Sequence, residues 1–329
     1  MTSDVALTGG SGLVGGHLLR SLVGSGLSVT AIVRSTAAAE RVAADGATPV
    51  LVDLFDGSGL QEALWGIPVL YHVAGVNETC PSDPAEMDRV NIEGTRSIIA
   101  ASATSGVGRI VYTSSAAAIG EAEGMIGTES TKHDGTYLSP YARSKHLAEV
   151  AAFTEASTLG VDLVAVNPSS VQGPGRSGGS ARILLYALRA KRPVLVDTKV
   201  SLIDIEDCTQ GHRAAAAKGR SGERYLLSGA TVSVSDAIAM AQEIAATTIT
   251  PRWLSHGVAR AVGRPAARVV NLVKPSADVC PALIDTLLHG HRFDGSRAER
   301  DLGIIYTPIE DTFRRTIEWF VEQGLVPSP

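Results

Sequence analysis

The feature that most constrains this chain is a glycine-rich loop between an apolar strand and a helix, close to the N-terminus. The strand is expected at residues 5–8 and the helix from Leu13 onward, with the run Thr8-Gly-Gly-Ser-Gly-Leu-Val-Gly15 joining them. Glycine tolerates a positive φ and lets backbone amides approach a bound group closely. A helix N-terminus adds free N–H groups and a partial positive charge. The loop therefore predicts a diphosphate site at the start of a βαβ unit.

The glycines of this loop satisfy two templates. Gly10, Gly12 and Gly15 match G-x-G-x-x-G, whereas Gly9, Gly12 and Gly15 match the wider G-x-x-G-x-x-G, and the sequence leaves both open. Either way, the residues expected to bind the cofactor here are Thr8, Gly9, Gly12, Leu13, Val14 and Gly15.

Short apolar runs alternate with helical stretches through the first half of the chain. Strands are expected at residues 5–8, 28–33, 48–52, 69–72, 109–113 and 162–167, and helices at residues 13–22, 86–103 and 141–158. Strands that alternate with helices make right-handed crossovers and a parallel sheet covered on both faces. The pattern predicts an α/β fold with a Rossmann-type doubly wound parallel sheet.

The alternation stops after Pro168. Residues 173–180 are rich in glycine and predict turns. Beyond them we expect helices at 181–188 and 234–245, the second capped by Ser233 or Ser235, a strand near 225–227, and a last helix with Ile309, Phe313, Ile317 and Phe320 on one apolar face. We expect a Rossmann domain over residues 1–170 and, over 171–329, mainly a smaller substrate-binding region with some segments returning to the Rossmann body.

Composition excludes several classes of protein. The 329 residues carry a net charge of −5 and no basic block, which argues against a nucleic-acid partner. No apolar run reaches the roughly 18 residues of a membrane span, and a strand so near the N-terminus leaves no room for a signal peptide. Cys80, Cys208 and Cys280 are far apart, so we expect no disulfide framework, a reducing compartment and a cytoplasmic location.

The end of the second strand indicates which dinucleotide is bound. A site for NAD usually has an acid about 20 residues after the glycine loop. Here Val33 holds that position and Arg34 and Ser35 follow it. A guanidinium pairs with a 2′-phosphate, and the serine adds a hydrogen bond. We therefore expect NADP(H) to be preferred, with NAD(H) as the alternative.

Residues after the third and fourth strands are expected to hold the adenosine half. Asp53, followed by Leu54, either accepts a hydrogen bond from the adenine amino group or serves as a capping or turn residue, and both interpretations stay open. Val73, Ala74 and Gly75 are small enough to leave room along the strand ends.

A tyrosine and a lysine indicate the chemistry. Tyr141 and Lys145 are four residues apart on a helix and so share one face. Free tyrosine has a pKa of roughly 10, which a nearby ammonium lowers, so Tyr141 can exchange a proton with a carbonyl or alcohol oxygen. Lys145 is also expected to hold the ribose hydroxyls of the nicotinamide. Ser115, at the end of the fifth strand, is expected to align the substrate oxygen, with Ser114 as its competitor.

Together these motifs resemble the extended short-chain dehydrogenase/reductase family, and within it the dihydroflavonol-reductase-like branch. The likeness rests on the glycine loop, the Ser-rich end of strand five, Tyr-Ala-Arg-Ser-Lys at 141–145, and Phe-Asp-Gly-Ser-Arg-Ala at 293–298. It implies a catalytic triad of Ser115, Tyr141 and Lys145. It also implies that Asn91 supports the lysine through water and that Pro168 and Val171 line the nicotinamide.

These features lead to one expected function and one alternative. We expect NADP(H)-dependent reduction of a small ketone or aldehyde, or oxidation of the matching secondary alcohol. The alternative is a nucleotide-sugar epimerase or dehydratase that retains NAD, with Arg176 and Arg182 holding a diphosphate. A cofactor-sensing protein without activity is disfavoured because such proteins commonly lose the tyrosine or the lysine.

The substrate is expected between the sheet edge and the second half of the chain. Candidate walls are residues 117–127, 173–179 and 199–203, with a lid over 127–137. His133, Tyr137 and Tyr186 are interpreted as ordinary loop or packing residues. No metal site is expected, because His289 and His291 lack a nearby acid or cysteine in the sequence, as does His256. The sequence leaves open whether the protein is a homodimer.

Overall fold

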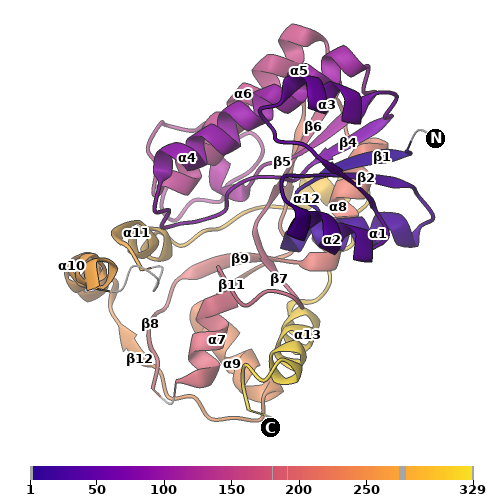
Figure 1. Ribbon diagram of the computed structural model, residues 1–329. Helices are drawn as coiled ribbons and strands as arrows, with labels where there is room; N and C mark the ends of the chain where they lie inside the picture. Colours follow the sequence, from indigo (N-terminus) through magenta and orange to yellow (C-terminus); the bar gives the residue numbers. More distant parts are fainter. Residues whose placement is uncertain (1–2, 180, 191, 274–278, 328–329) are drawn as a thin grey trace.

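The computed structural model describes residues 3–179, 181–190, 192–273 and 279–327 of the chain (Figure 1). Its central layer is a seven-stranded sheet in the order β10-β6-β5-β4-β1-β2-β3. Every neighbouring pair in it is parallel. The strands are β1 (Val5–Thr8), β2 (Val29–Val33), β3 (Thr48–Leu51), β4 (Val69–His72), β5 (Arg109–Thr113), β6 (Leu163–Pro168) and β10 (Arg224–Leu227). The expected Rossmann-type parallel sheet is confirmed.

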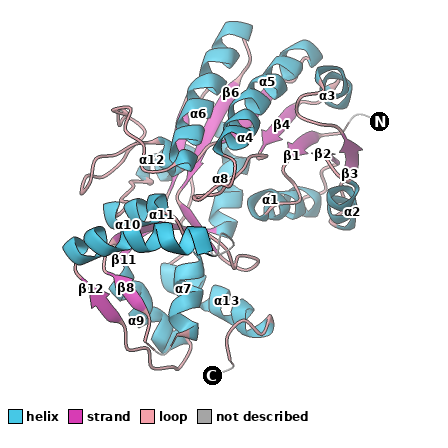
Figure 2. Ribbon diagram, turned by 60° about the vertical axis from the view of Figure 1, so that its left-hand side comes forward, coloured by secondary structure: helices cyan, strands magenta, loops and turns pink. Residues whose placement is uncertain are grey.

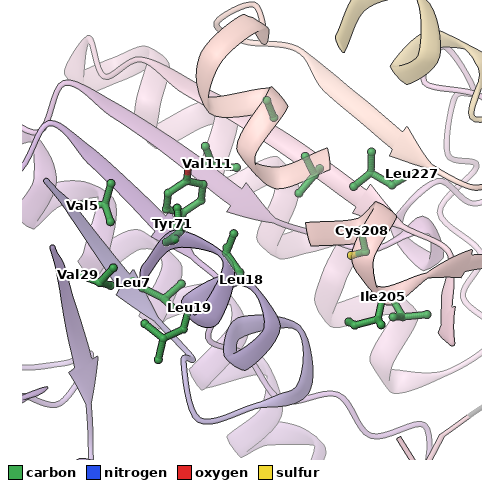
Figure 3. Close-up of a cluster of buried hydrophobic side chains, with 14 of the residues drawn as sticks. Val5, Leu7, Leu18, Leu19, Val29, Tyr71, Val111, Ile205, Cys208 and Leu227 are labelled. Carbon is green, nitrogen blue, oxygen red and sulfur yellow. The ribbon is translucent and has the colours of Figure 1, made fainter. Parts of the chain in front are cut away.

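Helices cover both faces of this sheet because successive strand residues point to opposite sides. Val5 and Leu7 pack in one core with Leu18 and Leu19 (Figure 3). The helices on this face are α1 (Leu13–Gly24), α2 (Thr36–Ala44), α8 (Ile205–Lys218) and α12 (Ser296–Leu302). Ala6, between Val5 and Leu7, packs in a second core. That core lies under α3 (Gly57–Leu64), α5 (Gly94–Ser105) and α6 (Pro140–Leu159).

The second half of the chain builds a smaller body beside the carboxyl edge of the sheet. It contains a sheet in the order β11-β9-β7 and a two-stranded pair, β12-β8. These strands are β7 (Ser170–Gln172), β8 (Val194–Val196), β9 (Lys199–Asp204), β11 (Ala230–Ser233) and β12 (Arg252–Leu254). The apolar face of α13 (Ile309–Glu322) packs there against α7 (Ala181–Arg189) and α9 (Val234–Ile244). Ser233 caps α9 by accepting a hydrogen bond from the amide of Asp236.

Two helices form the outer edge of this smaller body. Figure 2 shows α10 (His256–Val273) and α11 (Pro281–His289) side by side, and they pack against each other. Neither was anticipated from the sequence. Among the described residues, no helix has both the length and the apolar character needed to cross a bilayer.

One expected helix is broken into three pieces. The segment predicted as a helix over 86–103 consists of α4 (Pro84–Asp88), a π-helical turn η1 (Arg89–Glu93) and α5. Asp83 caps α4 with its carboxylate, and Pro84 occupies the first helical position. A π turn is wider than an α turn by one residue and often marks a functional position. Asn91 lies in this turn.

Cys80 and Cys280 form a disulfide across 200 positions of sequence, with their Cα atoms 5.8 Å apart. The expectation that the cysteines have no disulfide partner is therefore wrong for this pair. Sequence distance was a poor guide because the loop after β4 and the start of α11 meet in space. Cys208 is a buried free thiol.

Candidate active site

A single large cleft runs along the carboxyl edge of the sheet. Its volume is about 1590 Å³, and its walls come from the loops after β1 to β6 on one side and from the smaller body on the other. All but one of the residues predicted to be catalytic or to bind the cofactor line this cleft. The exception is Asn91, which lies behind the wall. Sequence positions more than 150 residues apart thus meet where the fold class predicts a site.

The glycine loop after β1 packs so closely on neighbouring backbone that a side chain at Gly9 or Gly15 would clash with it. Gly9 has a φ of +74°, and a Cβ there would lie 2.6 Å from the amide nitrogen of Ala74. A Cβ on Gly15 would lie 2.1 Å from the carbonyl oxygen of Gly9. At Gly10, by contrast, a Cβ would meet only side chains, at 3.3 Å. The G-x-x-G-x-x-G template is thus the one that the backbone requires, and the loop fits a diphosphate at the start of α1.

Thr8 fixes this loop to the end of β4. Its hydroxyl oxygen accepts hydrogen bonds from the amides of Val73 and Ala74, each at 3.1 Å, and lies 2.8 Å from Nδ1 of His72. Burial, with a contribution from Lys145, lowers the pKa of His72 to about 3, so the ring is neutral. With both amides donating to it, Thr8 donates to Nδ1, and His72 Nε2 then donates to Thr95 at 3.2 Å.

His72 was missed in the sequence analysis. Thr95 extends this chain of hydrogen bonds by donating to the main-chain carbonyl of Asn91 at 2.6 Å. A neutral histidine thus joins the glycine loop to the turn that holds Asn91. The only sequence signal was a histidine at the end of a strand followed by small residues.

The end of β2 and the start of α2 form the far end of the cleft. Arg34 is exposed there, and Ser35 caps α2 by accepting the amide of Ala38 at 3.3 Å. The hydrogen bond from Arg89 is the main cause that lowers the pKa of Glu86, and the charge of Arg34 adds to it. A helix start beside a guanidinium fits a phosphate.

Asp53 occupies a turn beside this end of the cleft. Its Oδ1 accepts the amide of Phe55 at 2.9 Å, which is the turn role that the sequence analysis left open. The same residue lines the cleft together with Leu54, so the adenine role also stays a prediction.

The start of α6 sets the positions of Tyr141 and Lys145. Ser139 caps the helix by accepting the amide of Ala142 at 3.1 Å, and Pro140 occupies its first turn. Lys145 Nζ donates to the carbonyl of Thr113 at 3.2 Å, which ties the helix to the end of β5. Tyr141 is hydrogen-bonded to Ser115. Serine, tyrosine and lysine therefore meet in one corner of the cleft.

Ser114 and Ser115 are distinguished by their surroundings. Ser115 contacts Tyr141 and begins the short 3₁₀ turn η2 (Ala116–Ala118), where its hydroxyl accepts the amide of Ala117 at 3.2 Å. The buried Oγ of Ser114 has no hydrogen-bond partner among the described residues. The contact with Tyr141 supports Ser115 as the serine of the triad.

Burial acts on both titratable groups of this corner. It raises the pKa of Tyr141, while the hydrogen bond from Ser115 and then the charge of Arg176 lower it. It lowers the pKa of Lys145 to about 8, against the opposing charge of Glu149. The sequence analysis expected Lys145 to provide the charge that lowers the pKa of Tyr141. The structure instead places Arg176 in that role, from a loop with no predicted contact to the tyrosine.

The side chain of Asn91 lies close to Lys145 and is positioned by the backbone of Val76. Its Oδ1 accepts the amide of Val76 at 2.7 Å, and its Nδ2 donates to the Val76 carbonyl at 3.0 Å and to Ser144 at 2.9 Å. A Cβ on Gly75 would lie 3.0 Å from Asn91 Oδ1 and 3.3 Å from Lys145 Nζ. Gly75 is therefore where the asparagine and the lysine come together.

A buried ion pair supports this corner from below. Glu149, one turn after Lys145, bonds to the guanidinium of Arg224 at 2.7 Å. It also accepts a hydrogen bond from Asn167, whose amide donates to the Ser115 carbonyl at 3.1 Å. Sequence analysis did not select these three residues, although an acid four positions after the lysine was a readable signal.

Both polar and apolar residues line the substrate side of the cleft. Each predicted wall segment contributes residues, including Glu121, Arg176 and Val200. Helix α11 adds a wall that the sequence did not predict, with Leu283, Ile284, Thr286, Leu287 and His289. His133 and Tyr186 also line the cleft. Tyr137 instead packs on His133, with ring centroids 4.8 Å apart.

The segment expected to be a lid is tied to the body at its start. The amide of Gly127 donates to the carbonyl of Arg292 at 2.8 Å, and the guanidinium of Arg224 holds the carbonyls of Glu129 and Thr131. Residues 127–131 are therefore anchored to the body of the protein by long-range hydrogen bonds that composition does not reveal.

The sequence predicted no metal site because His289 and His291 have no acid close to them along the chain, and this reason is wrong in three dimensions. His289 and His291 do have an acid beside them, since Glu121 lies next to both rings.

Comparisons with known proteins agree with this architecture. The sequence profile of the NAD dependent epimerase/dehydratase family matches residues 5–228. A protein provisionally named dihydroflavonol 4-reductase, from Synechocystis, is 31% identical over 98% of this chain and 96% of its own. A 4-hydroxy-2-methyl-3-oxo-4-farnesyl-3,4-dihydroquinoline-1-oxide ketoreductase from Stigmatella aurantiaca is 29% identical over 90% of each chain. A nucleoside-diphosphate-sugar epimerase from Pseudomonas aeruginosa has the same fold, with a TM-score of 0.79, 24% identity and 98% of each chain covered.

Proposed function

Because this chain belongs to the NAD-dependent epimerase/dehydratase family of oxidoreductases, we propose that it is an NADP(H)-dependent reductase of ketones or aldehydes. The observation that carries the proposal is the meeting of Ser115, Tyr141 and Lys145 in one cleft. The reductase and ketoreductase names of its relatives support the same reaction class.

The residues of the glycine loop and of α6 fit a nicotinamide dinucleotide. The absence of side chains at Gly9 and Gly15 lets the loop take its tight turn at the start of α1, and Lys145 lies farther along the cleft, beside Gly75. When bound, this cofactor supplies the hydride for reduction, or takes it up in the reverse direction.

The protein's own part in the reaction is to hold and protonate one oxygen. Ser115 donates a hydrogen bond to the substrate carbonyl oxygen and keeps it beside Tyr141. The Tyr141 hydroxyl then gives its proton to that oxygen as the alcohol forms. Arg176 carries positive charge near the phenolate that remains, which favours the transfer.

The preference for the phosphorylated dinucleotide rests on the end of β2. Val33 stands where an NAD site has its acid, and Arg34 follows it at the cleft. The start of α2, capped by Ser35, adds amides that suit a phosphate.

A substrate panel tests the proposal. Apo protein is mixed with NADPH or NADH and with aryl ketones, aldehydes, steroid ketones or nucleotide sugars, and absorbance at the reduced-nicotinamide band is followed. We expect consumption of NADPH with at least one carbonyl class. Consumption of NADH alone would overturn the cofactor assignment, and no net consumption with any carbonyl would overturn the reaction.

One observation favours a second candidate, a nucleotide-sugar epimerase or dehydratase. Arg176 and Arg182 both line the substrate side of the cleft, where a diphosphate would lie. An epimerase retains its NAD, so release of bound NAD⁺ from the denatured, freshly purified protein, together with turnover of a nucleotide sugar without net loss of reduced cofactor, would favour this candidate.

Location and assembly are part of the same proposal. We take the protein to act in the cytoplasm on a small molecule, with no nucleic-acid or membrane partner. Whether it does so as a homodimer is decided by light scattering of the purified protein.

A further inference from the structure

A second group of titratable side chains lies on the substrate side of the cleft. Glu121 follows η2, whereas His289 ends α11 and His291 comes two residues later. His291 Nδ1 lies 2.6 Å and His289 Nε2 3.7 Å from Glu121 Oε1. One ligand atom from each residue falls within 4.8 Å of the other two, and all three residues line the cleft.

The backbone conformation that brings these side chains together requires a glycine between the two histidines. Gly290 separates the two histidines with a φ of +70°, and a Cβ on it would lie 2.4 Å from Thr198 Oγ1. Ser201 holds the segment after it by donating to the His291 carbonyl at 3.3 Å and accepting the amide of Phe293 at 2.9 Å. The His-Gly-His turn thus presents both imidazoles to the carboxylate of Glu121.

The burial of the group suits a cation. The Glu121 side chain is only 4% exposed, and those of His289 and His291 are 11% and 25% exposed. Burial, and then the neighbouring His291, lower the pKa of His289, so its ring is neutral. His289 Nε2 donates a hydrogen bond to the main-chain carbonyl of Glu121 at 3.1 Å, so a bound metal ion would displace that proton. His291 is held in place by stacking on Phe293, with ring centroids 5.7 Å apart.

One of the two nitrogen–oxygen distances to Glu121 is close to what a shared ion would need, and the other is shorter. Zinc bonds nitrogen and carboxylate oxygen at about 2.0–2.2 Å, so two ligands on one tetrahedral ion are about 3.4 Å apart. The His289–Glu121 separation of 3.7 Å is close to that value. The His291–Glu121 contact of 2.6 Å is a hydrogen bond, which must lose its proton and open by about 0.8 Å to admit the ion.

We propose that Glu121, His289 and His291 form a binding site for a divalent transition-metal ion of the zinc type. Two imidazoles and one carboxylate are a donor set that zinc accepts, and three protein ligands leave a fourth position open. That position faces the cleft. Resting on the proposed function, the open position binds a second oxygen of the carbonyl substrate, which selects compounds with a hydroxyl, enol or carboxylate besides the reacting carbonyl.

Metal titration of the untagged, full-length protein tests the site without cofactor or substrate. After dialysis against EDTA, Zn²⁺ is titrated by calorimetry and Co²⁺ by visible absorption. We expect one ion per chain and a Co²⁺ spectrum of a low-coordinate site that shifts on addition of azide. We expect H289A/H291A to bind zinc at least about 100-fold more weakly. E121Q, which keeps the size of the buried side chain, should also weaken binding.

His17→Ala is the matched control, since it removes the imidazole of another His–Glu pair, 2.9 Å apart, outside the cleft. It should bind zinc like the wild type. Circular dichroism and thermal melting show whether each variant is folded. Absence of zinc binding by the wild type, or equal affinity in the folded double variant, would overturn the site. A Co²⁺ spectrum indifferent to azide would overturn its open position. Loss of reductase activity alone would leave these binding results standing, so the two proposals fail separately.

Discussion

The acidity of Tyr141 is set by its burial and by groups from two separate parts of the chain. Burial raises the pKa of its hydroxyl, and Ser115 from the end of β5 and Arg176 from the loop after β7 lower it. A proton donor in a carbonyl reduction must be protonated before the reaction and stabilised after losing its proton. The buried, hydrogen-bonded position provides the first condition, and the nearby guanidinium provides the second.

The lowered pKa of Lys145 predicts an alkaline loss of activity. Its folded-state pKa, about 8, lies below the ordinary value of 10.5, so the ammonium loses its proton earlier as the pH rises. If the reaction needs that charge, kcat/KM for NADPH should fall above about pH 8, roughly tenfold for each pH unit. The measurement is the pH profile of the reductase reaction. K145R, which keeps its charge through this range, should show lower activity without that limb. A wild-type profile that stays flat to pH 10 would contradict the role.

Arg34 predicts the choice of dinucleotide. In R34D the carboxylate should repel a 2′-phosphate and accept a bond from a 2′-hydroxyl, so the NADPH/NADH preference should move toward NADH by about 100-fold. The measurement is the dissociation constant of each dinucleotide by fluorescence titration. R96A removes an exposed arginine of α5 that pairs with Glu93, and its preference should be unchanged. Equal effects of the two substitutions would refute the assignment.

At the scale of elements, the glycine loop packs against the first turn of α1 so closely that Gly15 has no room for a side chain. In G15A the new Cβ would lie 2.1 Å from the Gly9 carbonyl oxygen, so the loop must open. We expect NADPH affinity to fall at least about 100-fold, because the backbone can no longer approach the diphosphate.

Gly24, the last residue of the same helix, is the matched control for that prediction. A Cβ there meets nothing within 4 Å. G24A should keep NADPH affinity and gain about 0.5 kcal/mol of stability or more. Calorimetric titration gives the affinities, and thermal melting gives the stabilities. Undiminished binding by a folded G15A protein would contradict the geometry described for the loop.

Local sequence pattern predicted the elements that make local or repeated contacts. The six strands of the first half and α1, α6, α7, α9 and α13 were all expected, because each has an apolar period and a clear start. The π turn at Arg89–Glu93 was not, since one extra residue in a turn leaves no trace in a 3.6-residue period. Strands β8 and β12 were missed because three residues carry too little pattern.

At the scale of the whole molecule, the chain leaves the Rossmann sheet after β6 and returns to it with β10. That path forms the cleft between the two bodies. Residues at strand ends, such as Ser115 and Arg34, were predictable because the fold class fixes where strand ends lie. The position of Arg176 beside Tyr141 and the grouping of Glu121, His289 and His291 were not, since only the path of the second half brings them there.

The Cys80–Cys280 disulfide joins the two sides of the cleft, because it ties the loop after β4 to the start of α11. Alkylation of the unfolded, unreduced protein should therefore label Cys208 alone, and prior reduction should expose all three cysteines. Mass spectrometry of the labelled peptides makes the measurement. Label on Cys80 and Cys280 without reduction, in protein purified with thiols blocked at lysis, would show that the bridge does not form.

The central claim is that the Tyr141 hydroxyl supplies the proton for carbonyl reduction beside a bound NADPH. The most direct measurement compares Y141F with the wild type, using NADPH binding by fluorescence and turnover on a ketone that the wild type reduces. The account predicts nearly unchanged NADPH affinity with turnover reduced about 10²- to 10⁴-fold. Turnover close to the wild-type rate in Y141F would contradict it.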